Sequence, residues 1–443
     1  MSLKKFKPER KTLPPAFGLQ PIASEKIILV GLELPGIGHW ELLETLEELR
    51  QLARTAGAEV MEIVTQKLEH PTAPYYIGKG KVEEVKALCA THGATLIVFD
   101  DELTPAQGRN LELLTSRKVI DRTQLILDIF AARARTREGR LQVELAQLQY
   151  LLPRLTRLWG HLSRQSGAIG TRGPGETQLE VDRRRVQERI ARLKEDIEGV
   201  RKIRKTQREG RLRAHWPIVS LVGYTNAGKS SLLNILTGAK VLEEDKLFAT
   251  LDPTTRQLEL PSHQKTLITD TVGFIRKLPH TLVESFKATL EEVELADLLI
   301  HVVDLSHPQY LEQMEAVKKI LAELGAAEKK MLIVFNKIDL LPDPALMEAE
   351  LHRFPGSVAI SARSGLGMKT FINALENALA AWRSEGLYHL PPSAGALLAE
   401  IHRVGHVIEL HYDGETTIVT ANVPPELAKK LELFATGTFS DLR

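Results

Sequence analysis

A glycine-rich segment at Gly223–Ser230 constrains the fold of this chain more than any other feature. It follows an apolar run, 217–222, typical of a buried strand, and it precedes Ser231–Leu236, which has the pattern of a helix start. A loop of this kind between a strand and a helix lets backbone N–H groups and the helix N-terminus surround phosphate groups. The sequence therefore predicts a P-loop nucleotide-binding domain, and a chance glycine-rich turn is the less favoured alternative.

Two side chains of this loop have the chemistry that phosphate and metal binding require. We expect Lys229 to reach the β- and γ-phosphates of a nucleotide and the Ser230 hydroxyl to ligate Mg²⁺. The candidate binding residues of the loop are Gly223, Tyr224, Thr225, Asn226, Ala227, Gly228, Lys229 and Ser230.

A second group of residues is expected beside the γ-phosphate. Asp270, at the end of the apolar strand Thr266–Thr269, would approach Mg²⁺ through water, and Gly273 would offer its N–H to the phosphate. In the preceding loop we choose Thr250 as the hydroxyl that completes the Mg²⁺ coordination only while the γ-phosphate is present. Residues Thr254 and Thr255 are rivals of the same type. The candidates of this group are Phe248, Ala249, Thr250, Leu251, Asp252, Asp270, Thr271, Val272 and Gly273.

A third group predicts which base is bound. The carboxylate of Asp339 can accept hydrogen bonds from the N1–H and the exocyclic amine of guanine, a pair of donors that adenine lacks. Asn336 and Lys337, which follow the apolar strand 331–335, would brace the loop and cover the base. The segment Ser361–Ala362 would place a backbone N–H at guanine O6. The candidates are Asn336, Lys337, Ile338, Asp339, Ser361, Ala362 and Arg363.

Hydrolysis of a guanine nucleotide would lack one usual group here. Many GTPases have a Gln after the Asp-x-x-Gly motif to orient the attacking water, but this chain has Phe274, whose ring has no donor or acceptor. Intrinsic hydrolysis should therefore be slow and need a partner or an ion. Asn226 is a candidate holder of K⁺ near the phosphates, and the alternative is that it only tightens the loop. The candidate catalytic residues are Lys229, Thr250, Gly273 and Asn226, and the candidate metal ligands are Ser230 and Thr250.

Two motifs outside the nucleotide-binding domain connect the chain with a known family. Residues Tyr76–Glu83 read YIGKGKVE, and Gly170–Arg185 read GTRGPGETQLEVDRRR. With the P-loop, FATLDPTTR and DTVGFIRKLPH, they make the chain resemble the HflX family of bacterial ribosome-associated GTPases, within the Obg–HflX group. The resemblance implies that the chain binds GTP and GDP, hydrolyses GTP, and acts on the large ribosomal subunit and its RNA, splitting or rescuing ribosomes under stress. It also implies ATP binding in the N-terminal region, which no residue pattern shows.

The composition restricts the compartment and the mode of RNA binding. The 58 Lys and Arg balance 57 Asp and Glu, for a net charge of +1, so nucleic-acid affinity has to come from local patches. The single cysteine, Cys89, excludes intrachain disulfides and fits a reducing compartment. No signal-peptide pattern and no long apolar run is present. We expect a cytoplasmic protein without a membrane span, monomeric off the ribosome, with loose membrane association left open.

The predicted elements divide the chain into five parts. A basic tail, 1–24, precedes a small parallel α/β domain at 25–130, because strands and helices alternate from the strand Lys26–Gly31 and the helix Trp40–Ala56 onward. A helical hairpin is expected at 131–215, the GTPase domain at 216–385, and a small α+β domain at 386–443, after a boundary at Leu387–Pro392. The fold class is a multidomain α/β protein built around a P-loop GTPase domain.

The hairpin is predicted from two series of apolar residues at helical spacing. One comprises Leu141, Leu145, Leu148, Leu152, Leu155, Leu158, Trp159 and Leu162, with Pro153 as a kink; the other comprises Val186, Ile190, Leu193, Ile197 and Val200. We expect two long antiparallel helices joined by a glycine-rich loop, Ser163–Thr177. From Val181 to His215 thirteen Lys or Arg oppose six Asp or Glu, a local net charge of +7. This excess favours contact with RNA phosphates over a merely solvated face.

Two classes of function are compatible with these patterns. In the first, the chain is a ribosome-bound GTPase whose nucleotide state controls an RNA-binding hairpin. In the second, it is an RNA-binding or remodelling module, driven by ATP, in which GTP is only a regulator.

Overall fold

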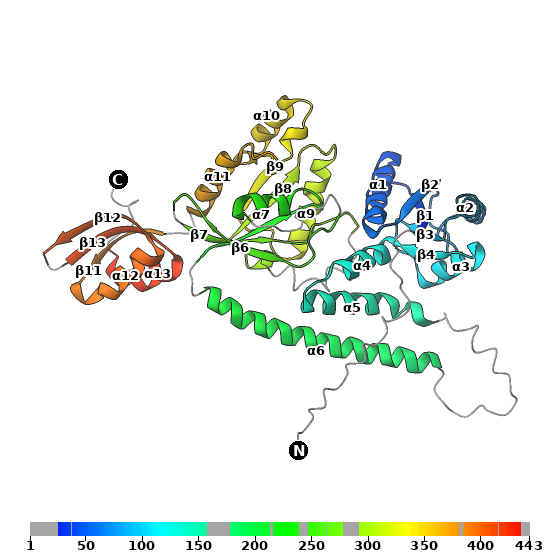
Figure 1. Ribbon diagram of the computed structural model, residues 1–443, viewed down its shortest axis with the longest axis horizontal. Coiled ribbons are helices and arrows are strands. Elements are labelled where there is room, and N and C mark those ends of the chain that lie inside the picture. The colour runs from blue at the N-terminus through cyan, green and yellow to red at the C-terminus, as the bar shows by residue number, and fades with distance from the viewer. Residues whose placement is uncertain are drawn as a thin grey trace, which may run out of the picture. The chain divides into compact units, whose positions relative to one another are not determined.

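The computed structural model describes residues 25–36, 38–156, 178–212, 216–238, 247–262, 264–277, 292–380, 384–414 and 416–435 (Figure 1). The chain divides into two compact units, Met1–Ile129 and Phe130–Arg443. Its sheets and helices confirm the predicted fold class, with a P-loop domain built on a mostly parallel sheet and a C-terminal α+β region.

The first unit is a parallel α/β domain. Its sheet has the strand order β2-β1-β3-β4, and all neighbouring strands are parallel. The strands are β1 (Lys26–Glu33), β2 (Glu59–Lys67), β3 (Leu96–Phe99) and β4 (Lys118–Asp121). The helices are α1 (His39–Ala56), α2 (Lys79–His92), α3 (Pro105–Thr115) and α4 (Arg122–Arg133), which crosses into the second unit. Cys89 of α2 is fully buried in the apolar core, as its helical context predicts.

The second unit begins with a pair of packed helices, α5 (Arg137–Leu151) and α6 (Gln178–Leu212). In Figure 1, α6 returns antiparallel alongside α5. Their shared core is the predicted seam, formed by Leu145, Leu148, Leu155, Val186, Leu193 and Ile197, with Leu141, Leu152 and Ile190 partly buried around it.

The first helix of this pair is shorter than its apolar spacing predicts. Helix α5 ends at Leu151, just before Pro153, and a short 3₁₀ turn (Arg154–Thr156) follows. Proline removes a backbone donor and clashes with the preceding turn, so it ends the helix here rather than kinking it. The predicted continuation through Leu158, Trp159 and Leu162, and the loop Ser163–Thr177, lie outside the described residues.

The GTPase domain is built on a six-stranded sheet of order β10-β9-β8-β5-β7-β6. Strand β6 pairs antiparallel with β7, and the other pairs are parallel. The strands are β5 (Ile218–Gly223), β6 (Thr254–Glu259), β7 (Lys265–Asp270), β8 (Leu298–Asp304), β9 (Met331–Asn336) and β10 (Val358–Ala359). The helices are α7 (Lys229–Thr237), α9 (Tyr310–Glu323), α10 (Pro344–Arg353) and α11 (Met368–Ala380).

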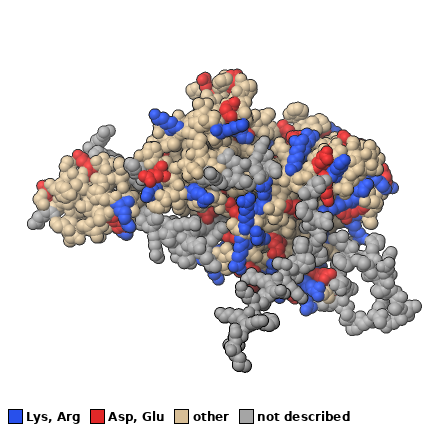
Figure 2. All heavy atoms as spheres, viewed as in Figure 1, with Lys and Arg blue, Asp and Glu red and all other residues tan. Residues whose placement is uncertain are grey.

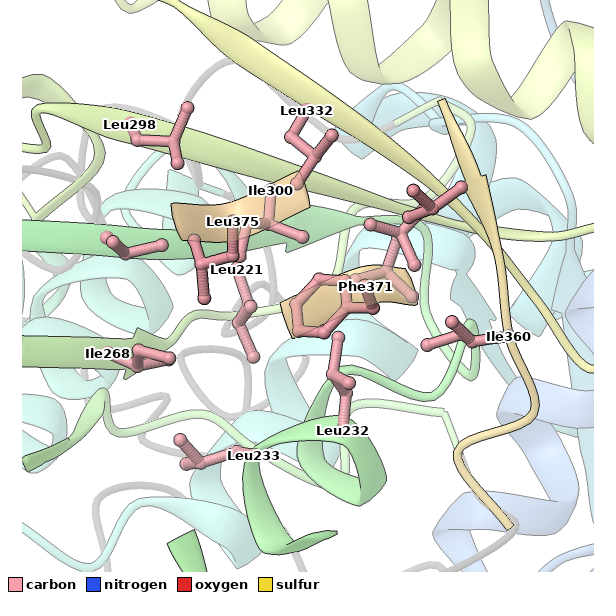
Figure 3. Close-up of a cluster of buried hydrophobic side chains, with 14 of the residues drawn as sticks. Leu221, Leu232, Leu233, Ile268, Leu298, Ile300, Leu332, Ile360, Phe371 and Leu375 are labelled. Carbon is pink, nitrogen blue, oxygen red and sulfur yellow. The ribbon is translucent and has the colours of Figure 1, made fainter. Parts of the chain in front are cut away.

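Alternating residues of the strands build two cores on opposite faces of this sheet. Leu332 and Val334 of β9 belong to a core that includes Leu232 of α7 and Phe371 of α11 (Figure 3). Ile333 and Phe335 belong to a second core with residues of α9 and α10. The sheet is therefore covered on both faces, and the loops at the carboxyl ends of β5, β7 and β9 meet at one edge, where ligands bind in open α/β sheets.

The C-terminal region is a three-stranded antiparallel sheet of order β11-β13-β12. Its elements are β11 (Ser384–Leu390), α12 (Gly395–Val404), β12 (His406–Asp413), β13 (Thr416–Val423) and α13 (Pro425–Leu431). Gly414, with φ 59°, forms the predicted hairpin turn between β12 and β13. The segment Leu387–Pro392, predicted only as a domain boundary, is mostly strand β11, because the backbone of residues 387–390 pairs antiparallel with β13.

The surface and the helix lengths agree with the composition. On the face shown in Figure 2, Lys and Arg lie among Asp and Glu rather than in one large field of a single sign. None of the helices in the described part of the chain is long and apolar enough to cross a bilayer.

Candidate nucleotide-binding site

The P-loop turns tightly between β5 and α7, and two of its glycines are required by geometry. Gly223 has φ 151° and Gly228 has φ 94°, both in the region that favours glycine. A Cβ atom on Gly223 would lie 2.3 Å from the carbonyl oxygen of Val302, and one on Gly228 would lie 2.1 Å from Asn336 Nδ2. The loop can therefore approach β8 and the end of β9 only because residues 223 and 228 are glycines, which have no Cβ atom.

Lys229, the first residue of α7, is buried behind this loop with 6% of its surface exposed. Its Nζ donates hydrogen bonds to the carbonyl oxygens of Tyr224, at 2.7 Å, and Gly223, at 3.2 Å. Burial lowers the pKa of Lys229 to about 8, and the nearby Asp270 carboxylate opposes this shift. An anionic ligand would favour the charged ammonium, so the side chain is suited to phosphate binding.

Oxygen atoms of three side chains converge next to Lys229. Ser230 Oγ donates to Asp270 Oδ2 at 2.6 Å, Thr250 Oγ1 donates to the same oxygen at 2.9 Å, and the two hydroxyls are 2.9 Å apart. The other carboxylate oxygen, Asp270 Oδ1, is buried without a hydrogen-bond partner among the described residues. Burial raises the pKa of Asp270, while Lys229 and the two hydroxyls oppose the shift. Two hydroxyls and a carboxylate form a hard oxygen donor set, and this set fits Mg²⁺.

The same geometry distinguishes Thr250 from its two rivals, Thr254 and Thr255, as the candidate hydroxyl beside the metal. Thr250 is the one whose hydroxyl contacts Asp270 and Ser230. Thr254 and Thr255 lie in strand β6, and the Thr255 hydroxyl is 2.9 Å from that of Thr269. Both residues belong to the sheet, whereas the Thr250 hydroxyl lies beside the oxygens of Ser230 and Asp270; the role of Thr250 at the metal stays a prediction.

Asn336 joins the base-binding loops to the P-loop. Its Nδ2 donates to the carbonyl oxygen of Ala227 at 2.8 Å, and its Oδ1 accepts from the backbone N–H of Ala362 at 2.9 Å. The N–H of Ser361 is donated to the carbonyl oxygen of Leu366. Both of these N–H groups therefore have partners inside the protein in this structure; Ala362 lines the pocket, and the expected contact with guanine O6 stays a prediction.

Residues of all three candidate groups, the P-loop, the γ-phosphate group and the base group, line one pocket of about 440 Å³. Its predicted members are Thr225, Asn226, Gly228, Lys229, Ser230, Phe248, Ala249, Thr250, Thr271, Gly273, Asn336, Lys337, Asp339, Ala362 and Arg363. Ser231 and Leu340 also line it, although no sequence motif singled them out; their places directly after Ser230 and Asp339 were the available signal. Asp252 does not line the pocket; its carboxylate instead accepts hydrogen bonds from the backbone of Arg135 and Thr136.

Phe274 cannot take part in hydrolysis in this arrangement. It is 1% exposed, its backbone N–H donates to Gly223 at 3.1 Å, and its carbonyl accepts from Thr225 at 2.8 Å. The residue thus fastens the strand-end loop to the P-loop, and its ring is not among the groups that line the pocket. Asn226, with φ 60°, is a pocket residue.

Comparison with known sequences identifies the family. Residues 218–337 match the profile described as "50S ribosome-binding GTPase". Residues 43–131 match "GTP-binding GTPase N-terminal", and residues 133–211 match "GTP-binding GTPase Middle Region". A curated GTPase HflX of Caldanaerobacter subterraneus subsp. tengcongensis is 49% identical over 410 residues, covering 93% of this chain and 94% of the relative. The chain belongs to the HflX family. The Escherichia coli GTPase HflX is 47% identical over 364 residues, covering 82% of this chain and 85% of that protein.

Membership in the HflX family establishes the chemistry of the pocket at the level of the reaction. As an HflX-family protein with a GTPase domain, the chain hydrolyses GTP. Among solved structures, a GTP-binding protein from the archaeon Sulfolobus solfataricus in complex with GDP is 26% identical, with a TM-score of 0.43, covering 80% of this chain and 98% of that one.

Proposed function

We propose that this HflX-family GTPase binds the large ribosomal subunit and splits or rescues ribosomes under stress. The observation that carries the proposal is the exposed basic side of α6. Arg183, Arg184 and Arg185 are all exposed, while Val186 and Leu193 of the same helix are buried against α5. The apolar face thus packs against α5 while the arginines are exposed to solvent, where phosphate groups of folded RNA can reach them; proteins recognise folded RNA mainly by shape and backbone charge.

The description of the matched profile supports the choice of partner. Residues 218–337 match a GTPase domain whose description names the 50S subunit. We therefore assign 131–215 as the ribosomal-RNA contact, 216–385 as the GTPase domain, 25–130 as the N-terminal α/β domain and 386–443 as the C-terminal domain. ATP binding by the N-terminal region stays a prediction of the family resemblance.

Within the GTPase domain, the geometry supports a role for each candidate catalytic residue. Lys229 would bind the β- and γ-phosphates, Gly273 would donate its N–H to the γ-phosphate, and Thr250 would close over the pocket. Bound Mg²⁺, held by Ser230 and Thr250, would neutralise charge on the phosphates. Because Phe274 is buried and apolar, the groups that orient water have to come from a bound partner or from an ion near Asn226.

Cosedimentation with ribosomes tests the proposal. The full chain, loaded with GDP or with a non-hydrolysable GTP analogue, is mixed with intact ribosomes and with separated subunits. We expect the analogue-bound form to pellet with large subunits, to shift intact ribosomes toward free subunits, and to show GTP turnover that rises when large subunits are added. Lys229→Ala, which loses phosphate binding, is the control. Equal pelleting in both nucleotide states, without stimulated turnover, would contradict the proposal.

A further inference from the structure

The loop that carries Thr250 is held at a second point, outside the nucleotide pocket. Asp252 Oδ2 accepts hydrogen bonds from the backbone N–H groups of Thr136, at 2.8 Å, and Arg135, at 2.9 Å. The Thr136 hydroxyl donates to Asp252 Oδ1 at 2.5 Å. Thr136 is the N-cap of α5. The carboxylate therefore lies at a helix N-terminus, where unpaired N–H groups and the helix dipole favour a negative charge.

The first turn of α5 leaves room for this carboxylate. A Cβ atom on Gly139 would lie 2.4 Å from Asp252 Oδ1 and 3.2 Å from Thr136 Oγ1. Glycine is a poor helix former, so local helix propensity does not explain it in the first turn. The close approach of the Asp252 carboxylate does explain it.

Phe248 holds the loop on the other side of Thr250. It is 2% exposed, has φ 55°, and its ring packs edge-to-face against Phe130 of α4 with the centroids 4.7 Å apart. Thr250 thus lies between two anchored residues, and its own hydroxyl contacts Asp270. A displacement of Thr250 from the metal site cannot be absorbed freely between Phe248 and Asp252.

We propose that the Asp252 carboxylate is a latch that couples the nucleotide state to the α5–α6 helix pair. While Thr250 is held at the metal and γ-phosphate side of the pocket, Asp252 caps α5. When the γ-phosphate is lost, Thr250 is released and the cap is weakened. The inference rests on GTP hydrolysis by this domain, and it gives the proposed ribosomal function a route from the pocket to the basic helix.

Coupling of this kind works in both directions. If the triphosphate state stabilises the cap, then whatever stabilises the cap strengthens triphosphate binding by the same factor. A ribosome that holds α6 in place, and α5 with it through their shared core, would thereby favour the GTP-bound form. Breaking the latch should lower the affinity for a GTP analogue relative to GDP by on the order of fivefold or more.

Two variants break the latch from opposite sides. Asp252→Asn removes the negative charge and one acceptor from the loop. Gly139→Ala changes only α5; it places a methyl group where the carboxylate lies and also raises helix propensity. A loss of coupling in Gly139→Ala would therefore come from crowding at the N-cap, where the added Cβ meets the Asp252 carboxylate and the Thr136 hydroxyl, and not from lower helix propensity. Gly108→Ala is the matched control, because a Cβ on this helical glycine of α3 meets open space.

Hydrogen exchange at the N-terminus of α5 in the full chain is the measurement. In the wild type, we expect the amides from Arg135 to Arg140 to exchange on the order of tenfold more slowly with a non-hydrolysable GTP analogue and Mg²⁺ than with GDP. The difference should fall below about twofold in both latch variants and persist in Gly108→Ala. All variants should still bind GDP, which separates failure of the latch from failure of the GTPase site.

Two results would overturn the proposal. One is a wild type whose α5 amides exchange equally in the two nucleotide states. The other is a nucleotide-dependent difference that survives unchanged in Gly139→Ala. If Asp252→Asn no longer binds GDP, Gly139→Ala alone decides, because that variant leaves the loop sequence intact.

Discussion

At the scale of single residues, we predict that the choice of base depends on one carboxylate, that of Asp339. Asp339 lies on a short 3₁₀ turn (Ile338–Leu340) and lines the pocket, and Asn336 holds the adjacent strand end against the P-loop. In Asp339→Asn, the side-chain amide can present a donor where guanine requires an acceptor. We expect GTP binding to fall at least about 100-fold and xanthosine triphosphate to become the preferred ligand. Competition binding checks this, and equal affinity of the wild type for ATP and GTP would refute the assignment of Asp339.

The missing glutamine gives a second prediction, about ions. Asn226 lines the pocket in a left-handed conformation, while Phe274 is buried away from it. If Asn226 holds K⁺ beside the phosphates, GTP turnover in K⁺ should exceed turnover in Na⁺ by on the order of tenfold, and Asn226→Ala should abolish the difference. Steady-state turnover in the two salts, at equal ionic strength, is the measurement. Equal rates in the wild type would leave a partner as the source of assistance.

A third prediction concerns pH and the buried His301 of β8. Its side chain is 1% exposed, and burial lowers its pKa from the usual 6.5 to about 3, with Lys318 and Lys229 adding to the shift. Below pH 6.5 the His301 imidazole is therefore protonated in the unfolded chain, while it stays neutral in the folded chain. The contribution of the neutral His301 side chain to the free energy of unfolding is fully present above pH 6.5. It is lost as the pH falls from 6.5 toward 3, at about 1.4 kcal/mol per pH unit.

The variant His301→Leu should remove this acid sensitivity. In the wild type, His301 Nδ1 has no hydrogen-bond partner in the part of the chain that the structure describes. Replacing His301 by an apolar residue therefore leaves no described donor unpaired. Thermal unfolding of the GDP-bound chain at pH 7.5 and pH 5.5 would measure the effect. The wild type should lose more stability than the variant on acidification; identical losses would mean that other groups dominate.

Single residues of the site differ in how far sequence could predict them. Lys229, Ser230 and Asp339 follow apolar strands within recognisable motifs, and the structure places all three around one pocket. Thr250 could not be separated from its rivals by type, because the choice depends on which hydroxyl reaches Asp270. A backbone N–H of Ser361–Ala362 was expected at the base, and sequence could not show that the N–H of Ala362 donates to Asn336, because this contact is tertiary.

At the scale of helices and strands, periodicity was sufficient where an element has one clear apolar pattern. Strand β1 was predicted to within two residues and helix α1 to within one, and the predicted seam residues from Leu141 to Leu155 and from Val186 to Ile197 belong to the α5–α6 core. Strand β8 was not predicted, although its sequence LLIHVVD forms a buried strand at the centre of the sheet. Strand β11 was missed because Pro391 and Pro392 suggested a boundary, while its pairing with β13 is a long-range contact.

The basic side of α6 leads to a prediction at the same scale. Arg184 and Arg185 are exposed and make long ion pairs with Glu188, at 3.5 Å, and Asp182, at 3.6 Å; exposed pairs of this kind contribute little to stability. Replacing Arg183, Arg184 and Arg185 by Gln should therefore leave folding intact. It should weaken binding to large subunits and flatten its salt dependence by about one unit of log–log slope for each RNA phosphate that the variant no longer neutralises.

Binding to large subunits at several salt concentrations measures this slope. The control replaces Lys318 and Lys319, which are exposed on α9 of the GTPase domain, and it should keep the wild-type slope. If the triple variant also keeps the wild-type slope, α6 does not contact phosphates.

At the scale of the whole molecule, sequence identified the parts but not their coupling. The P-loop domain and the helical pair were each predicted from local patterns. The bond between them, from Asp252 to Thr136, joins residues 116 positions apart, and neither residue has a pattern that names its partner. The sequence feature that reflects this hydrogen bond is Gly139, a glycine in the first turn of a helix.

The last prediction separates the helical pair from its connecting loop. The part of the α5–α6 packing core that the structure describes lies outside Ser163–Thr177, so replacing that segment by a short Gly-Ser linker should leave the two helices packed. Nucleotide affinity should stay within about twofold of the wild type, because loop length changes closure entropy only slowly. Stimulation of GTP turnover by large subunits and the separation of ribosomes should be lost if the loop enters a crevice of ribosomal RNA. A variant that retains both activities would show that the exposed arginines of α6 are sufficient and that the loop is only a connection.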